Sequence, residues 1–222
     1  AARAWIVPES DQIHQLVIVA HRAVADWAGL QSVAAQIASM LRADARPAPL
    51  PDHDFGSWQR QWSQTEDFLA QRAWWKASLQ PPLPVLQLPS VGRRSTQRTF
   101  AAACVHADVP AALAARLAAL ADSQGAQKLQ ALLLAVYGAV LARYASQDDL
   151  VVGWHVGLQG LAPAASGLQP QENWLPLRLS VDAALGFDVL QEQVCARLHD
   201  AWQRRGVPFD VLLRDMGVPA RS

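Results

Sequence analysis

Hydrophobic residues occur first in short continuous runs and later in stripes with helical spacing. The apolar run within residues 13–20 predicts a buried strand. Another strand is predicted at residues 3–7, and a turn-rich segment separates these two strands. Residues 30–41 repeat apolar side chains at every third or fourth position, which is typical of an amphipathic helix. The pattern therefore predicts two strands followed by a helix.

The rest of the pattern predicts a mixture of helices and strands. A Trp-rich helical stretch is predicted over residues 55–79 and ends at consecutive prolines, which cannot continue a helix. Later strands are predicted at residues 99–107, 150–156 and 174–181, and helices at residues 110–125, 129–144 and 187–203. The helix at 129–144 is almost wholly apolar, so we expect it to be buried on most sides. This order favours an α/β fold.

Composition narrows the class of protein. Hydrophobic residues make up 51% of the 222 positions, which is enough for a sizeable core, and 19 basic residues balance 19 acidic ones. Without a basic cluster, neither nucleic acid nor an anionic membrane is an expected partner. No apolar run is long enough to span a membrane and the start lacks a signal-peptide layout, so a cytoplasmic location is predicted. Cys104 and Cys195 are predicted to be buried thiols, and no metal site is expected.

Residues 21–27 carry the pattern with the clearest chemical meaning. They read His-Arg-Ala-Val-Ala-Asp-Trp and follow a predicted strand, which would deliver them as a loop to the edge of a sheet. The loop resembles the His-His-x-x-x-Asp-Gly signature of the condensation-domain superfamily of nonribosomal peptide synthetases, which shares its fold with chloramphenicol acetyltransferases. Arg22 stands at the second His, Asp26 at the Asp, and Trp27 at the Gly.

Five further segments match the family in its order along the chain. They resemble its Asp-(Phe/Tyr)-x-x-Trp-Gln-Arg, Leu-x-Leu-Pro, Tyr-(Ser/Thr)-Gln-(Glu/Asp)-Asp, Asn-Thr-x-x-x-Arg and Pro-Phe-(Glu/Asp) segments, at residues 52–60, 86–89, 144–153, 173–178 and 207–210 respectively. With the loop, these matches span nearly the whole chain, which is identified as a member of this family. The departures fall at positions that the family associates with function, whereas the scaffold agrees.

The resemblance implies a chloramphenicol acetyltransferase-like two-layer sandwich of the α/β class. Residues 1–50 would form the end of the N-terminal lobe with its signature loop, residues 51–95 a Trp-rich helical linker, and residues 96–222 most of the C-terminal lobe. Only part of the N-terminal lobe is expected within the chain. The family acts on thioesters held by the phosphopantetheine arm of a partner carrier domain, and no directly bound cofactor is expected.

The replacement at position 22 changes what the loop can do. The resemblance implies that the second His is the general base for the attacking amine. A guanidinium stays protonated and has no lone pair to accept a proton. We therefore assign no catalytic residue among the motif positions His21, Arg22 and Asp26. His21 is expected to be structural, and His155 has no neighbouring Ser, Cys or acid in the sequence to form a catalytic pair.

Further roles are implied by the resemblance. Asp26 is expected to form a structural salt bridge with Arg178 that holds the loop to a neighbouring strand. Trp27, Asn173 and Trp174 are expected to line or block the substrate channel. Most other tryptophans are interpreted as core packing because of their roughly helical spacing, among them Trp58, Trp62, Trp74 and Trp75.

Three functions are compatible with these patterns. The favoured one is a degenerate, non-catalytic condensation-like domain that docks a carrier protein and a trans-acting tailoring enzyme, in antibiotic or siderophore biosynthesis. X-type domains, with a His-Arg-x-x-x-Asp-Asp signature, recruit monooxygenases in this way, and interface-type domains recruit hydroxylases. The alternative is an active condensation or epimerisation domain that joins carrier-bound aminoacyl or peptidyl thioesters, because positioning by itself accelerates reactions. The third is a structural spacer domain.

Overall fold

The computed structural model describes residues 2–42, 55–89, 102–158, 160–161 and 172–218. Contacts divide the chain into two compact units, each assembled from segments that are distant in the sequence. The first unit contains residues 1–75, 155–174 and 205–222, and the second contains residues 76–154 and 175–204.

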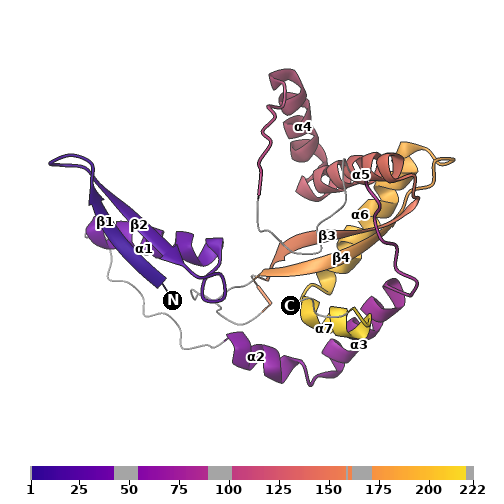
Figure 1. The fold of residues 1–222 in the computed structure, drawn as a ribbon, viewed down its shortest axis with the longest axis horizontal. Coiled ribbons are helices and arrows are strands. Elements are labelled where there is room, and N and C mark those ends of the chain that lie inside the picture. The colour runs from indigo at the N-terminus through magenta and orange to yellow at the C-terminus, as the bar shows by residue number, and fades with distance from the viewer. Residues whose placement is uncertain (1, 43–54, 90–101, 159, 162–171, 219–222) are drawn as a thin grey trace. The chain divides into compact units, whose positions relative to one another are not determined.

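A β-hairpin opens the first unit. Strands β1 (Ala2–Pro8) and β2 (His14–Ala20) pair antiparallel, with Ala2 opposite Ala20 and Pro8 opposite His14 (Figure 1). The two predicted strands are confirmed, but the predicted burial of the second is wrong. Leu16, Val17 and Val19 are all at least 40% exposed, because no further described strand extends this two-stranded sheet and no described layer buries these side chains.

Three helices follow the hairpin. Helix α1 (Trp27–Leu41) starts three residues before the predicted helix, because Asp26 caps its first turn. The predicted helix over 55–79 is interrupted and forms α2 (Phe55–Trp62) and α3 (Glu66–Ser78). Thr65 explains the interruption: its hydroxyl donates to the carbonyl of Trp62 at 2.7 Å and accepts from the amide of Phe68 at 3.3 Å. A side chain that bonds in this way ends one helix and caps the next.

The tryptophans of α2 and α3 pack against other aromatic rings, but the core-packing interpretation is confirmed only for Trp75, since Trp58, Trp62 and Trp74 are half-buried. Trp62 stacks on Trp58 with ring centroids 5.5 Å apart and meets the edge of Phe68 at 5.1 Å. Trp75 is fully buried and packs edge-on against Trp74. The aromatic rings therefore form a chain of contacts along α2 and α3.

Gly206→Ala is expected to lower the free energy of unfolding by about 1 to 3 kcal/mol through overpacking. An added Cβ would lie 2.7 Å from Cη2 of Trp62, and that ring is held by its stack on Trp58 and by a hydrogen bond to Asp67. Urea unfolding measures the change. Adding Trp62→Leu to the Gly206→Ala protein should make the cost of the alanine smaller than it is beside tryptophan, and an equal cost in both backgrounds would contradict the proposed clash.

The second unit packs helices against a two-stranded sheet. Strands β3 (Asp149–Gly157) and β4 (Glu172–Ser180) pair with each other, and both run on into the first unit. Helix α5 (Ala126–Ala145) packs against both α4 (Ala111–Gln124) and α6 (Phe187–Gln203). A Cβ on Gly138 of α5 would lie 3.3 Å from the side chain of Leu179, so the helix also lies close against β4.

The core of the second unit lies between the helices and the sheet. Besides Leu79, which follows α3, its buried apolar residues come from α5, β3, β4 and α6: Ala131, Ala135, Leu141, Leu150, Leu175, Leu177, Leu179, Leu190, Val194, Leu198 and Ala201. The strands and helices predicted for residues 110–203 are confirmed, and α6 has the predicted bounds.

Three predictions for this region are wrong. Residues 102–107 form no strand and are exposed, because no other described strand pairs with them; residues 99–101 lie outside the described residues. Cys104 is consequently exposed, whereas Cys195 is half-buried as part of α6. Helix α5 is buried along one face only, while its other side exposes Leu133, Tyr137 and Val140.

A short helix near the end of the first unit was not predicted. Helix α7 (Phe209–Asp215) follows Pro208, carries Asp210 in its first turn and Arg214 in its last. These residues favour a helix at those positions and were a usable signal in the sequence. The division into segments 1–50, 51–95 and 96–222 stays a prediction about family lobes, since the two compact units are discontinuous in the sequence.

Candidate functional site

The signature loop is tied to the start of β4 by a charged side chain. His21 to Ala25 form a turn in which the carbonyl of His21 accepts from the amides of Val24 and Ala25. From this turn, Nη2 of Arg22 donates to Oε2 of Glu172 at 3.0 Å. The residue that replaces the expected base is therefore engaged in an ion pair.

The same carboxylate oxygen receives a second donor from β3. Nε2 of His155 lies 3.0 Å from Oε2 of Glu172, and the imidazole packs against the ring of Trp174 at a centroid distance of 4.8 Å. Through this shared oxygen, the imidazole and the guanidinium lie close to each other. Arg22, Glu172 and His155 form one cluster, named here the loop cluster.

The loop cluster corrects the interpretation of His155. An acid neighbour is absent in the sequence, but Glu172 faces His155 because the residues belong to paired strands. Glu172 itself was missed by sequence analysis. Its signal was weak: one charged residue directly before an apolar strand segment.

The environment of Glu172 favours its ionised form. Burial raises the pKa of this carboxyl, but the hydrogen bonds from Arg22 and His155 outweigh it, so the net pKa is lowered. The side chain is 21% exposed, whereas that of Arg22 is 74% exposed. At neutral pH Glu172 is therefore a carboxylate that can only accept hydrogen bonds.

The next residue is Asn173, and its side-chain amide forms all of its hydrogen bonds to the backbone. No donor or acceptor of this amide is left for a ligand. Its Nδ2 donates to the carbonyls of Arg205 at 2.8 Å and Val207 at 2.7 Å. Its Oδ1 accepts from the amides of Trp174 at 3.0 Å and Phe209 at 3.1 Å. Only 6% exposed, Asn173 fixes the 205–209 segment to β4.

A cavity of about 500 Å³ opens beside these residues in the first unit. Aromatic rings and two carboxylates contribute to its wall. It is lined by Ala23, Phe55, Gly56, Gln59, Leu158, Glu172, Asn173, Trp174, Pro208, Phe209 and Asp210. Two of the three residues predicted to line or block a channel, Asn173 and Trp174, therefore border a cavity that also contacts the signature loop.

The remaining motif residues have structural partners. His21 is exposed, and its Nδ1 accepts from the amide of Ala23 at 3.1 Å. Trp27 is 69% exposed at the start of α1 and does not line this cavity, so its blocking role stays a prediction. Asp26 is buried, and its Oδ1 accepts from the amide of Gly29 at 2.7 Å. Within its own unit, Asp26 thus acts as a helix cap.

Arg178 forms an ion pair within the second unit, whereas its expected salt bridge with Asp26, a residue of the first unit, stays a prediction. Its guanidinium contacts the carboxylate of Asp149, with Nη2 2.6 Å from Oδ2. Asp149 lies beside Arg178 because the amide of Val181 donates to the carbonyl of Asp148, which brings the start of β3 beside the end of β4. Arg178 also donates to the carbonyls of Gln80 and Pro82, so it anchors the segment that follows α3.

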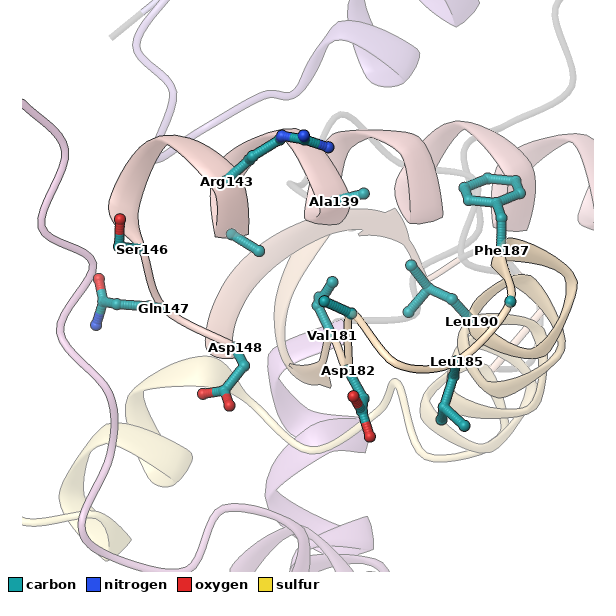
Figure 2. A pocket seen from close by; sticks show the side chains of 13 residues that line it. Ala139, Arg143, Ser146, Gln147, Asp148, Val181, Asp182, Leu185, Phe187 and Leu190 are labelled. Carbon is teal, nitrogen blue, oxygen red and sulfur yellow. The ribbon is translucent and has the colours of Figure 1, made fainter.

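A second cavity of about 580 Å³ lies in the second unit, between the end of α5, the 181–186 turn and the start of α6. Figure 2 shows the guanidinium of Arg143 on α5, the carboxylates of Asp148 and Asp182 on another part of the wall with Leu185 beside Asp182, and the ring of Phe187 at the start of α6. This mixture of charges and apolar groups does not single out one class of ligand. No residue of the signature loop lines it.

Two other kinds of feature are absent from the described residues. No helix in that part of the chain combines the length and hydropathy that a membrane crossing requires. Among the residues placed by the structure, no three His, Cys, Asp or Glu side chains gather to hold a metal ion.

Comparison with known proteins identifies the class. The condensation-domain model matches residues 2–222. Tyrocidine synthase 3 of Brevibacillus parabrevis is 27% identical over 212 residues, which are 95% of this chain and 3% of that protein. The X-domain from teicoplanin biosynthesis superposes with a TM-score of 0.82 and 23% identity, covering 99% of this chain and 51% of that one. A chain in the complex of the X-domain and OxyB from teicoplanin biosynthesis superposes with a TM-score of 0.79 and 24% identity. The match covers 99% of this chain and 50% of that one.

The chain belongs to the condensation-domain family. It is a condensation-like domain of the nonribosomal peptide synthetase type, which confirms the predicted family and the acetyltransferase-like α/β fold. It spans about half the length of the solved chains that it matches and a small part of the synthase.

Proposed function

We propose that this domain is a docking platform in a peptide assembly line, and that its signature loop supplies no general base from position 22. The observation that carries the proposal is the ion pair between Arg22 and Glu172. A permanently charged guanidinium that is bonded to a carboxylate has no means of taking a proton from an amine.

The partners follow from the relatives. Condensation domains work with carrier domains, so the docked partner is a carrier protein whose phosphopantetheine arm holds an acyl or peptidyl thioester. A solved relative is in complex with OxyB, which supports a trans-acting tailoring oxygenase as a second partner. This proposal includes no cofactor bound directly by the domain, because the phosphopantetheine arm belongs to the carrier protein.

Binding measurements on the parent protein test the docking function. Titrating it with a carrier domain from the same assembly line that bears a phosphopantetheine arm is expected to give saturable binding, which Arg22→Ala preserves within about threefold, because docking does not depend on a proton acceptor. Gln193→Ala, on the exposed side of α6, is the matched control. Absence of carrier binding by the unmodified protein would refute the docking proposal.

A second candidate function is amide-bond formation between carrier-bound thioesters. One observation favours it: the structure places an imidazole and a carboxylate in contact beside the signature loop. A structural spacer has no comparable feature in its favour.

A further inference from the structure

We propose that His155, oriented by Glu172, is a proton acceptor that belongs to β3 and replaces the one absent from the signature loop. This inference goes beyond the docking function and assigns the chemistry of the second candidate function to a named residue. It rests on the geometry of the loop cluster, which brings an imidazole close to the guanidinium at position 22.

The hydrogen bond defines which ring nitrogen is free. Glu172 is ionised and can only accept, so Nε2 of His155 must carry the proton that it shares at 3.0 Å. A neutral imidazole then has its lone pair on Nδ1. A carboxylate that fixes the tautomer and orientation of a histidine is the arrangement that general bases use in nucleophilic catalysis.

Arg22 has a supporting part in this arrangement. Arg22 donates to the same carboxylate oxygen as His155 and so helps to fix the Glu172 side chain that orients the imidazole. Arg22 is thus a positioning residue.

Access to the imidazole is available from solvent. The side chain of His155 is 38% exposed. Its ring packs against Trp174, and both Trp174 and Glu172 line the cavity that contacts the loop. His155 does not itself line this cavity, so an amine would reach the imidazole from the solvent-exposed side, next to the wall formed by Trp174 and Glu172.

The proton transfer balances without a further reactant. The amine nitrogen attacks the thioester carbonyl carbon, the C–N bond forms, and the C–S bond breaks with its electron pair on sulfur. Nδ1 of His155 takes the proton lost by the nitrogen. The same proton then passes to the phosphopantetheine thiolate, which restores the neutral imidazole.

The tautomer is the first test and needs no substrate. Long-range proton–nitrogen NMR spectra of the parent protein labelled with ¹⁵N-histidine should show neutral His155 protonated on Nε2, with His155→Gln providing the assignment. Glu172→Leu should remove this preference. A proton on Nδ1 in the unmodified protein would overturn the proposal.

Turnover is the second test, with an acetyl-loaded carrier domain as donor and a glycyl-loaded one as acceptor. His155→Gln is expected to lower kcat by about 100-fold or more, as loss of a general base does, and to leave carrier binding unchanged. His199→Gln, an exposed histidine of α6, is the control and should keep the full rate. A rate unaffected by His155→Gln, or no turnover by the unmodified protein, rejects the proton acceptor. Carrier binding, measured in parallel, decides the docking function separately.

Discussion

Asn173→Leu is expected to lower the free energy of unfolding by about 3 to 5 kcal/mol, although the two side chains have similar sizes. The leucine would leave the carbonyls of Arg205 and Val207 without their partner, and likewise the amides of Trp174 and Phe209. An unsatisfied buried polar group costs about 1 to 3 kcal/mol, and partial access of water to the cavity reduces the sum.

Urea unfolding followed by far-UV circular dichroism measures this change. Gln193→Leu introduces the same side chain on the exposed face of α6 and should stay within about 0.5 kcal/mol of the unmodified protein. If Asn173→Leu were as mild as this control, Asn173 would not be holding the 205–209 segment, and the account of its four bonds would fail.

Arg178→Met is expected to cost about 2 to 3 kcal/mol, because it removes the ion pair with Asp149 and the hydrogen bonds to Gln80 and Pro82. This loss of stability is smaller than for a fully buried ion pair, because a quarter of the Arg178 side chain is exposed and water screens the two charges. Hydrogen exchange should also become faster in residues 80–88, which the guanidinium anchors. Arg214→Met breaks an exposed pair with Asp210 and should change stability by less than about 0.5 kcal/mol.

The effect of Arg178→Met should depend on pH. The hydrogen bond from Arg178 lowers the pKa of Asp149, against the opposing effect of burial. A lowered folded-state pKa stabilises the protein above the unfolded value of about 3.9 and loses its effect as pH falls through the folded value. The difference in unfolding free energy between the two proteins should therefore be constant at neutral pH and shrink below about pH 4. A gap that widens in acid would contradict the pairing.

The sequence was informative wherever a local pattern decides the structure. The hairpin strands, α4, α6 and the sheet strands were predicted with small errors at their ends, because hydrophobic spacing and cap residues act within a few positions. Burial was less predictable. The exposed strand β2 and the exposed side of α5 both carry strongly apolar sequences, and only the presence or absence of a packed neighbour decides whether such a surface is buried.

The candidate site shows the same division. Position 22 identified the altered loop, since the chemistry of a guanidinium does not depend on the fold. The contact between Arg178 and Asp149 was not predicted in this way, because it is the pairing of β3 with β4 that brings Asp149 to the guanidinium.

By itself, then, the sequence determined the family, the order of most helices and strands, and the loss of a titratable group at position 22. Tertiary structure decided which charges meet. Glu172 is separated from Arg22 by 150 positions and lies on a different strand from His155, yet one of its oxygen atoms contacts both side chains because folding brings distant residues together. Such contacts depend on geometry that no local pattern encodes.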